Sequence, residues 1–153
     1  MRLQEKVDLV QPVDFVRVVE VWEASVRATH HFVAESDIQF FKPLVLEEIS
    51  NSRELQLACV RDEEGAVAGF IGVAHDKVEM LFVHPSWRGQ GVGSTLLNYA
   101  VHELHAATLD VNEQNEQALG FYLRMGFEVV GRSELDGTGK PYPLLHMRLV
   151  TIA

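Results

Sequence analysis

The stretch 84–101, HPSWRGQGVGSTLLNYAV, decides the fold because it sets three glycines directly before a helical pattern. Gly89, Gly91 and Gly93 stand at alternate positions, where they give the backbone a freedom that other residues lack. The apolar residues after them recur every three or four positions: Val92, Leu96, Leu97, Ala100, Val101 and Leu104. Such a stripe predicts an amphipathic helix that begins within the glycine segment.

Strands are predicted on the amino-terminal side of this loop. Residues 77–84 form one of them, and the run 80–83 is apolar on both faces, as in a central strand. Residues 54–61 and 66–75 also read as strands, and the short loop between them ends in a glycine. This arrangement predicts a β-hairpin, and therefore antiparallel pairing, ahead of the glycine loop.

Helices and further strands are predicted on both sides of these segments. A second, shorter helix is predicted from Pro43 to Ser50, after a first helix whose single apolar face carries Phe15, Val18, Val19, Trp22 and Val26. Beyond the glycines we predict a strand at 107–111, a helix at 115–125 ended by Gly126, and strands at 127–133 and 143–150. The predicted fold class is α/β, with a mixed, mostly antiparallel central sheet flanked by helices, in one domain over residues 1–153.

Composition narrows the classes of function. The 153 residues include 13 Lys and Arg against 22 Asp and Glu, a net charge of −9, and no basic stripe is visible. We therefore expect no nucleic-acid partner. No run approaches the ~20 apolar residues of a membrane-spanning helix, so we expect no membrane partner. Cys59 is the only cysteine, which rules out an internal disulfide and suits a cytoplasmic location.

A strand that enters a glycine-rich loop and then a helix is a favourable place to bind phosphate. The first N–H groups of a helix have no partner within the helix, and the helix dipole adds partial positive charge there. Glycines let the main chain approach an anion closely, so that several N–H groups converge on it. The loop at 84–94 therefore predicts an anion site.

Three phosphate-binding patterns compete for this loop. A P-loop requires Gly-Lys-Ser/Thr, but the only Gly-Lys pair, at 139–140, is followed by Pro141. A dinucleotide fingerprint fits Gly89 and Gly91, meets Ser94 at its third glycine, and finds an acidic residue at a suitable distance in Asp110. An NAD-binding oxidoreductase is therefore one alternative.

The third pattern, Arg/Gln-x-x-Gly-x-Gly/Ala, is matched by residues 88–93, RGQGVG. At this point the sequence resembles the GNAT superfamily of acetyl-CoA-dependent N-acetyltransferases. LFVHPSWRGQGVGSTLL (81–97) is similar to the family's strand, pyrophosphate loop and helix, and VNEQNEQALGFYLRMGF (111–127) to its second cofactor segment. The predicted order of elements over 7–150 agrees with a GNAT-like fold, and GKPYPLL (139–145) resembles small single-domain bacterial members.

The resemblance implies acetyl-CoA as cosubstrate, no metal, and a defined set of cofactor contacts. Main-chain amides at Phe82 and Val83 would hold the pantetheine arm. Asn115 would hydrogen-bond the cofactor, although its position also suits a helix N-cap. The pyrophosphate would bind main-chain amides of the loop, in Arg88, Gly89, Gln90, Gly91, Val92, Gly93 and Ser94.

The implied reaction is direct attack of a primary amine on the thioester. An alkyl amine has a pKa of about 10.4, so it is almost entirely protonated at pH 7 and must lose a proton first. Glu79 is our first candidate for the base because strand alternation puts it on the same side as Val83, with Asp76 or a chain of waters as alternatives. Tyr122 matches the family's tyrosine that faces the sulfur, where it would donate a hydrogen bond; the alternative is packing on the face that carries Ala118 and Met125.

The acceptor amine should lie under the connection between the first two helices. Candidates there are His30, His31 and Phe32, with one of the two histidines expected to contact the amine, and the loop that carries Tyr142 could cover the same mouth. The sequence leaves the acceptor open among small metabolites, polyamines, antibiotics, protein N-termini and lysines. It also leaves open a non-catalytic acyl-CoA-binding or sensor module, and the resemblance implies a homodimer as a common assembly.

Overall fold

The computed structural model describes residues 2–150, which divide into two compact parts, one up to Ala106 and one from Ala107 onward. The first part is built on four strands: β1 (Asp8–Leu9), β2 (Leu55–Arg61), β3 (Val67–Ala74) and β4 (Lys77–Val83). They pair in chain order, and every pair is antiparallel. The predicted β2–β3 hairpin is confirmed. Its loop is held by Asp62, whose Oδ1 accepts the N–H groups of Glu64 at 2.9 Å and Ala66 at 3.0 Å.

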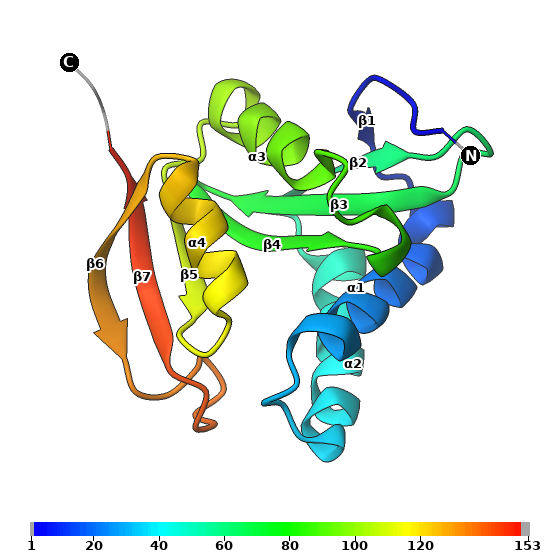
Figure 1. Cartoon of the computed structure of the whole chain (residues 1–153). Helices are drawn as coiled ribbons and strands as arrows, with labels where there is room; N and C mark the ends of the chain where they lie inside the picture. Colours follow the sequence, from blue (N-terminus) through cyan, green and yellow to red (C-terminus); the bar gives the residue numbers. More distant parts are fainter. Residues whose placement is uncertain (1, 151–153) are drawn as a thin grey trace. The chain divides into compact units, whose positions relative to one another are not determined.

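Helices cover both faces of this four-stranded sheet (Figure 1). Helices α1 (Phe15–Thr29) and α2 (Glu35–Asn51) lie on the face that carries Phe70, whose side chain is fully buried among residues such as Val18 and Ile49. Helix α3 (Val92–Glu103) lies on the other face, where a Cβ on Gly69 of β3 would come within 2.6 Å of Val92. Two short 3-10 helices, η1 (Pro12–Asp14) and η2 (Pro85–Trp87), precede α1 and α3.

The second helix is longer than the sequence predicted. It begins at Glu35 rather than at Pro43, and Pro43 lies inside it. Its apolar positions pack against the core on both sides of the proline, through Ile38, Phe41, Val45 and Ile49. Glu35 and Asp37 also lie in the first turn, where carboxylates favour a helix start. Packing and favourable end charges therefore outweigh the hydrogen bond that the proline removes.

The second part contains β5 (Thr108–Asn112), α4 (Glu116–Arg124), β6 (Phe127–Ser133) and β7 (Leu144–Leu149). Strand β7 pairs antiparallel with both β5 and β6. Helix α4 packs against one face of these strands, where Leu109, Phe127 and Met147 are buried (Figure 1). The predicted fold class, mostly antiparallel strands flanked by helices, is confirmed in both parts, whereas the single domain over 1–153 stays a prediction. None of the helices within residues 2–150 has the length and apolarity that crossing a membrane requires.

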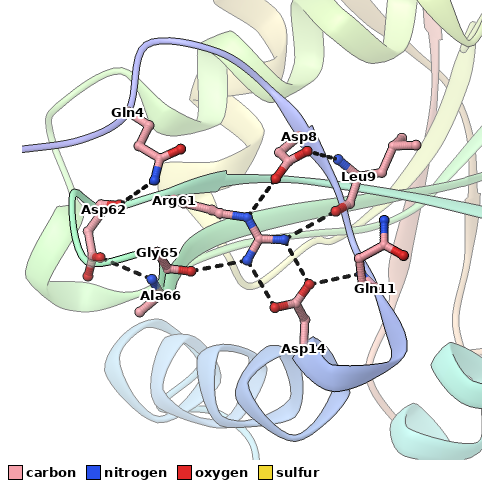
Figure 2. A network of polar contacts seen from close by, with 9 residues as sticks. All are labelled: Gln4, Asp8, Leu9, Gln11, Asp14, Arg61, Asp62, Gly65 and Ala66. Atoms are coloured by element: carbon pink, nitrogen blue, oxygen red, sulfur yellow. Dashed lines mark hydrogen bonds and ion pairs between the residues drawn. The ribbon is translucent and has the colours of Figure 1, made fainter.

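The guanidinium of Arg61, at the end of β2, ties three segments of the first part together (Figure 2). It donates to both carboxylate oxygens of Asp14, at 2.8 and 2.9 Å, and to Asp8 at 2.8 Å. It also donates to the carbonyl oxygens of Gly65 at 3.1 Å and Leu9 at 3.2 Å. The side chains of Arg61 and Asp14 are only 12% and 13% exposed, so these bonds are partly shielded from water. Strand β1, the start of α1 and the β2–β3 hairpin therefore share one charged centre.

Replacing Arg61 by methionine should lower the free energy of unfolding by about 2 kcal/mol, because the partly buried Asp14 loses its cation and both guanidinium donors and keeps only the N–H of Gln11. Methionine keeps much of the apolar stem but none of the donors. The control is Arg27→Met, because Arg27 is exposed and its ion pairs with Glu23 and Glu35 should add little. Thermal unfolding measures both changes. A loss for Arg61→Met no larger than that for Arg27→Met would contradict the prediction.

The difference between wild type and Arg61→Met should also depend on pH. Hydrogen bonds from Arg61 hold the pKa of Asp14 below its usual value of 3.8. A lowered pKa in the folded state adds stability above the unfolded pKa, and this stability is lost as the pH falls through the folded pKa. The difference should be complete at neutral pH and should shrink as the pH falls from about 5 to 2.

Candidate active site

The turn between β4 and α3 is shaped by two residues with left-handed backbone. Gly89 has φ 75° and Gly91, the N-cap of α3, has φ 83°. Residues with a Cβ rarely adopt such angles, so the glycines are needed for their backbone and not for lack of space. On the other side of the turn, the ring of His84 accepts the N–H of Ser86 at 3.1 Å, and Trp87 is buried. The turn is therefore held by packing and a hydrogen bond at its start, near His84 and Trp87, and has left-handed backbone at its end, at Gly89 and Gly91.

The start of α3 presents main-chain donors that no residue of the described chain accepts. The first helical hydrogen bond runs from the N–H of Thr95 to the carbonyl of Gly91, at 2.9 Å. Within residues 2–150, the N–H groups of Val92, Gly93 and Ser94 make no hydrogen bond, and no side chain caps this helix. Three N–H groups at the positive end of a helix dipole suit an anion such as a diphosphate.

One predicted acceptor residue, His30, lies against the predicted cofactor strand. Its ring centroid is 6.5 Å from that of Phe82 on β4 and 5.2 Å from that of Phe32. Burial, with a smaller contribution from His31, lowers the pKa of His30 to about 4. The imidazole is therefore uncharged at neutral pH. His31 is exposed, so only one of the two predicted histidines belongs to this packed cluster.

Hydrogen bonds also select the tautomer of His30. The hydroxyl of Thr29 lies 2.7 Å from the carbonyl of Ser25, which can only accept, and 2.7 Å from Nδ1 of His30. Because the hydroxyl hydrogen goes to Ser25, Nδ1 of His30 must carry a hydrogen and donate it to Thr29. The lone pair of the neutral ring is then on Nε2, which can accept a hydrogen bond from a ligand.

The predicted base, Glu79, is exposed on β4 and has a neighbour that the sequence analysis missed. Glu48 of α2 lies close enough that partial desolvation and then the Glu79 charge raise its pKa. The charge of Glu79 thus acts on Glu48, and two negative charges that act on each other favour a cation in their neighbourhood. Asp76, the alternative base, lies in the turn between β3 and β4. Periodicity could not have found Glu48, because it reports which face of α2 is apolar but not which strand the helix contacts.

Asn115 and Tyr122 lie in the second part, at the start and in the body of α4. Oδ1 of Asn115 accepts the N–H of Ala118 at 3.2 Å, so the N-cap interpretation is confirmed. Tyr122 is 8% exposed and packs edge-on against Phe121 and Phe127, at centroid distances of 5.2 and 6.2 Å. Burial raises the pKa of its hydroxyl.

The Tyr122 hydroxyl makes no hydrogen bond within the described chain. Every fully buried polar side-chain atom of residues 2–150 does have a hydrogen-bond partner, so the hydroxyl oxygen of Tyr122 cannot be one of them. This oxygen is therefore partly exposed, and a bound molecule could reach it. Tyr142 is also 8% exposed, and its N–H donates to the carbonyl of Lys140 at 2.8 Å. Its side chain is thus packed rather than extended from a mobile loop.

Comparison with known proteins places these features in a family. The profile of the acetyltransferase (GNAT) domain matches residues 20–150. The peptidyl-lysine N-acetyltransferase YjaB of Salmonella typhimurium is 40% identical over 131 residues, which cover 86% of this chain and 88% of that protein. The Escherichia coli protein of the same name is 40% identical over 133 residues, covering 87% of this chain and 88% of that protein.

Solved structures show the same fold. The solution structure of apo YjaB from Escherichia coli superposes with a TM-score of 0.84 at 36% identity, covering 99% of this chain and all of that one. The PaiA N-acetyltransferase of Thermoplasma acidophilum, solved in complex with coenzyme A, superposes with a TM-score of 0.72 at 18% identity. It covers 98% of this chain and 100% of that one, and at this identity it supports the fold alone.

Replacing Gly91 by alanine should weaken coenzyme A binding about 10- to 100-fold, the equivalent of one or two hydrogen bonds to a charged group. The reason is that alanine strains the left-handed backbone and turns the N–H groups of α3 away from a common point. Calorimetric titration measures the change. Gly137→Ala is the control because Gly137 has no left-handed backbone and open space around it. Unchanged affinity in Gly91→Ala would contradict an anion site at this turn.

Proposed function

The chain belongs to the GNAT acetyltransferase family, and from this premise we propose that it transfers the acetyl group of acetyl-CoA to the side-chain amine of a lysine in a protein or peptide. The family inferred from the two sequence segments is confirmed, and the chain is an acyltransferase. The observation that carries the proposal is the set of three N–H groups that follow the left-handed Gly91 and have no hydrogen-bond acceptor in the described chain. This chain is 40% identical to a peptidyl-lysine N-acetyltransferase.

In this proposal, acetyl-CoA supplies the acetyl group as a thioester, and main-chain donors of this chain bind its diphosphate. The donors are the amides of the loop from Arg88 to Ser94, of which Val92, Gly93 and Ser94 have no other acceptor in the described chain. Amides at Phe82 and Val83 take the pantetheine arm. The side-chain amide nitrogen of Asn115, whose oxygen is used in the N-cap, donates to the cofactor.

The acceptor site is proposed to bind an ammonium group and remove one proton from it. The carboxylates of Glu79 and Glu48 attract the cation, and Glu79 takes the proton before the amine attacks. His30 does not repel the ammonium, because burial keeps the imidazole neutral. These groups favour a lysine side chain over an uncharged acceptor. His31 and Tyr142 stay predicted acceptor contacts.

Tyr122 is proposed to assist the departure of coenzyme A. Because burial raises its pKa, the hydroxyl stays protonated at neutral pH and can donate a hydrogen bond to the sulfur. A thiol has a pKa of about 8.5 and a phenol about 10, so this hydrogen bond requires no complete transfer of the phenol proton.

The alternatives are not favoured. Asp110, the acidic residue that a dinucleotide fingerprint would use, receives a hydrogen bond from His146 at 2.6 Å. A non-catalytic acyl-CoA sensor would not depend on the Tyr122 hydroxyl. A cytoplasmic location and a homodimer stay predictions.

Tyr122→Phe should lower kcat for acetylation of a lysine peptide by about 100-fold, the usual contribution of one positioned proton donor. The dissociation constant of coenzyme A should stay within about twofold, since the substitution removes one oxygen that contacts only the sulfur. Steady-state kinetics and calorimetric titration measure the two quantities. Tyr99→Phe, on α3, is the control. An unchanged kcat in Tyr122→Phe would revive the sensor interpretation.

A peptide with one lysine and a blocked N-terminus should be acetylated faster than the same peptide with norleucine for lysine and a free N-terminus. Glu79→Gln should lower kcat/KM for the lysine peptide at pH 7 by about 10- to 100-fold. The loss should shrink as the pH approaches about 10, where the amine deprotonates without help. Glu47→Gln, beside Glu48 on α2, is the control. Preference for the N-terminal amine would contradict a lysine acceptor.

A further inference from the structure

Three side chains from the three strands of the second part form a hydrogen-bonded line that the acetyl transfer proposed above does not use. Oγ of Ser133 on β6 lies 2.7 Å from Nε2 of His146 on β7. Nδ1 of the same ring lies 2.6 Å from Oδ1 of Asp110 on β5. Both distances are short for hydrogen bonds of these types.

The acceptors decide where the hydrogens lie. An ionised carboxylate can only accept, so Nδ1 of His146 carries a hydrogen and donates it to Asp110. In the neutral ring Nε2 then carries a lone pair, and it accepts a hydrogen bond from the hydroxyl of Ser133. This order of serine, Nε2, Nδ1 and carboxylate is that of a hydrolase triad, in which the histidine activates the serine oxygen.

A β-bulge puts these residues on one face. Asp110 is paired with His146, and the neighbouring pair, Leu109 and Met147, is buried on the α4 side. Between β6 and β7 the register shifts at Val130, so that Gly131 rather than Val130 stands opposite His146. Because a shift of one residue turns every later side chain to the opposite face, the bulge moves Ser133 from the α4 side to the side of His146.

Gly131 stands directly beside the ring. A Cβ at this position would lie 3.4 Å from Cδ2 of His146, so the imidazole lies against the β6 backbone between Gly131 and Ser133. The side chains of His146 and Asp110 are 36% and 23% exposed, which leaves the line within reach of a small substrate.

We infer that Ser133 is a nucleophile, activated by His146 and held in register by Asp110, that accepts the acyl group of a small activated ester. Oγ attacks the carbonyl carbon, and the new C–O bond replaces the bond from that carbon to the leaving oxygen. Nε2 of His146 takes the hydroxyl proton and returns it to the leaving oxygen, while Asp110 stays ionised. Water then attacks the acyl-serine, again with His146 as base, and releases the carboxylic acid and free Ser133.

The first test uses p-nitrophenyl acetate and a fluorophosphonate probe on the full chain without coenzyme A. The wild type should release p-nitrophenol in a burst, and peptide mass spectrometry should find the phosphonyl group on Ser133. Ser133→Ala should lose the burst and the labelling, whereas Ser36→Ala, which removes an exposed hydroxyl on α2, should keep both. No labelling of wild-type Ser133, or equal hydrolysis by Ser133→Ala, would overturn the inference.

The second test asks whether the line acts as a unit. His146→Gln and Asp110→Asn should each slow labelling of Ser133 by about 100-fold or more. The first removes the base that takes the proton of Ser133, and the second removes the carboxylate that holds the ring of His146 in the right tautomer. The shift in melting temperature with coenzyme A shows that each variant is folded. Labelling at the wild-type rate in a folded His146→Gln protein would show that Ser133 needs no base, and would overturn the role of the line.

Discussion

The candidate active site depends on one constraint of the backbone: a helix cannot bond its own first N–H groups. A side-chain cap can meet part of this need, as Asn115 does for α4, whereas α3 begins at a glycine that has no side chain. The left-handed Gly91 turns the chain so that three consecutive donors point out of the helix start. Val92 is buried under them against β3. The binding of a charged ligand is thus built into the place where the strand ends and the helix begins.

Burial has opposite effects on the pKa values of His30, in the first part, and Tyr122, in the second part, with one chemical result. It lowers the pKa of His30 and raises that of Tyr122, and in both cases it favours the neutral form. Glu79, by contrast, stays exposed. In the reaction proposed above, a cationic acceptor would therefore meet negative charge but no positive charge from this histidine, and the departing sulfur would meet a proton donor. Which side chains are covered from water thus sets the charges that the proposed reaction uses.

Local pattern predicted much of this molecule. The β2–β3 hairpin, the stripe of α3 and the strands at 127–133 and 143–150 all repeat at the period of their element, and the structure confirms them. The start of α2 was wrong because Pro43 outweighed an apolar stripe that continues on both sides of it. Contacts between distant segments could not be predicted at all: the charge of Glu79 acting on Glu48, His30 against Phe82, and Ser133 beside His146, where a bulge reverses the face that strict strand alternation would give. A single amino-acid sequence carries no record of such pairs.

The Arg61 centre has a consequence for the time course of folding. Its carboxylate partners lie 47 and 53 residues away in the chain, so it can form only after the β2–β3 hairpin and the start of α1 have met. Interactions that form late, after the transition state, slow unfolding and leave the folding rate nearly unchanged. We therefore expect this centre to slow unfolding, which lengthens the lifetime of the native state and protects the amino-terminal segment from proteases.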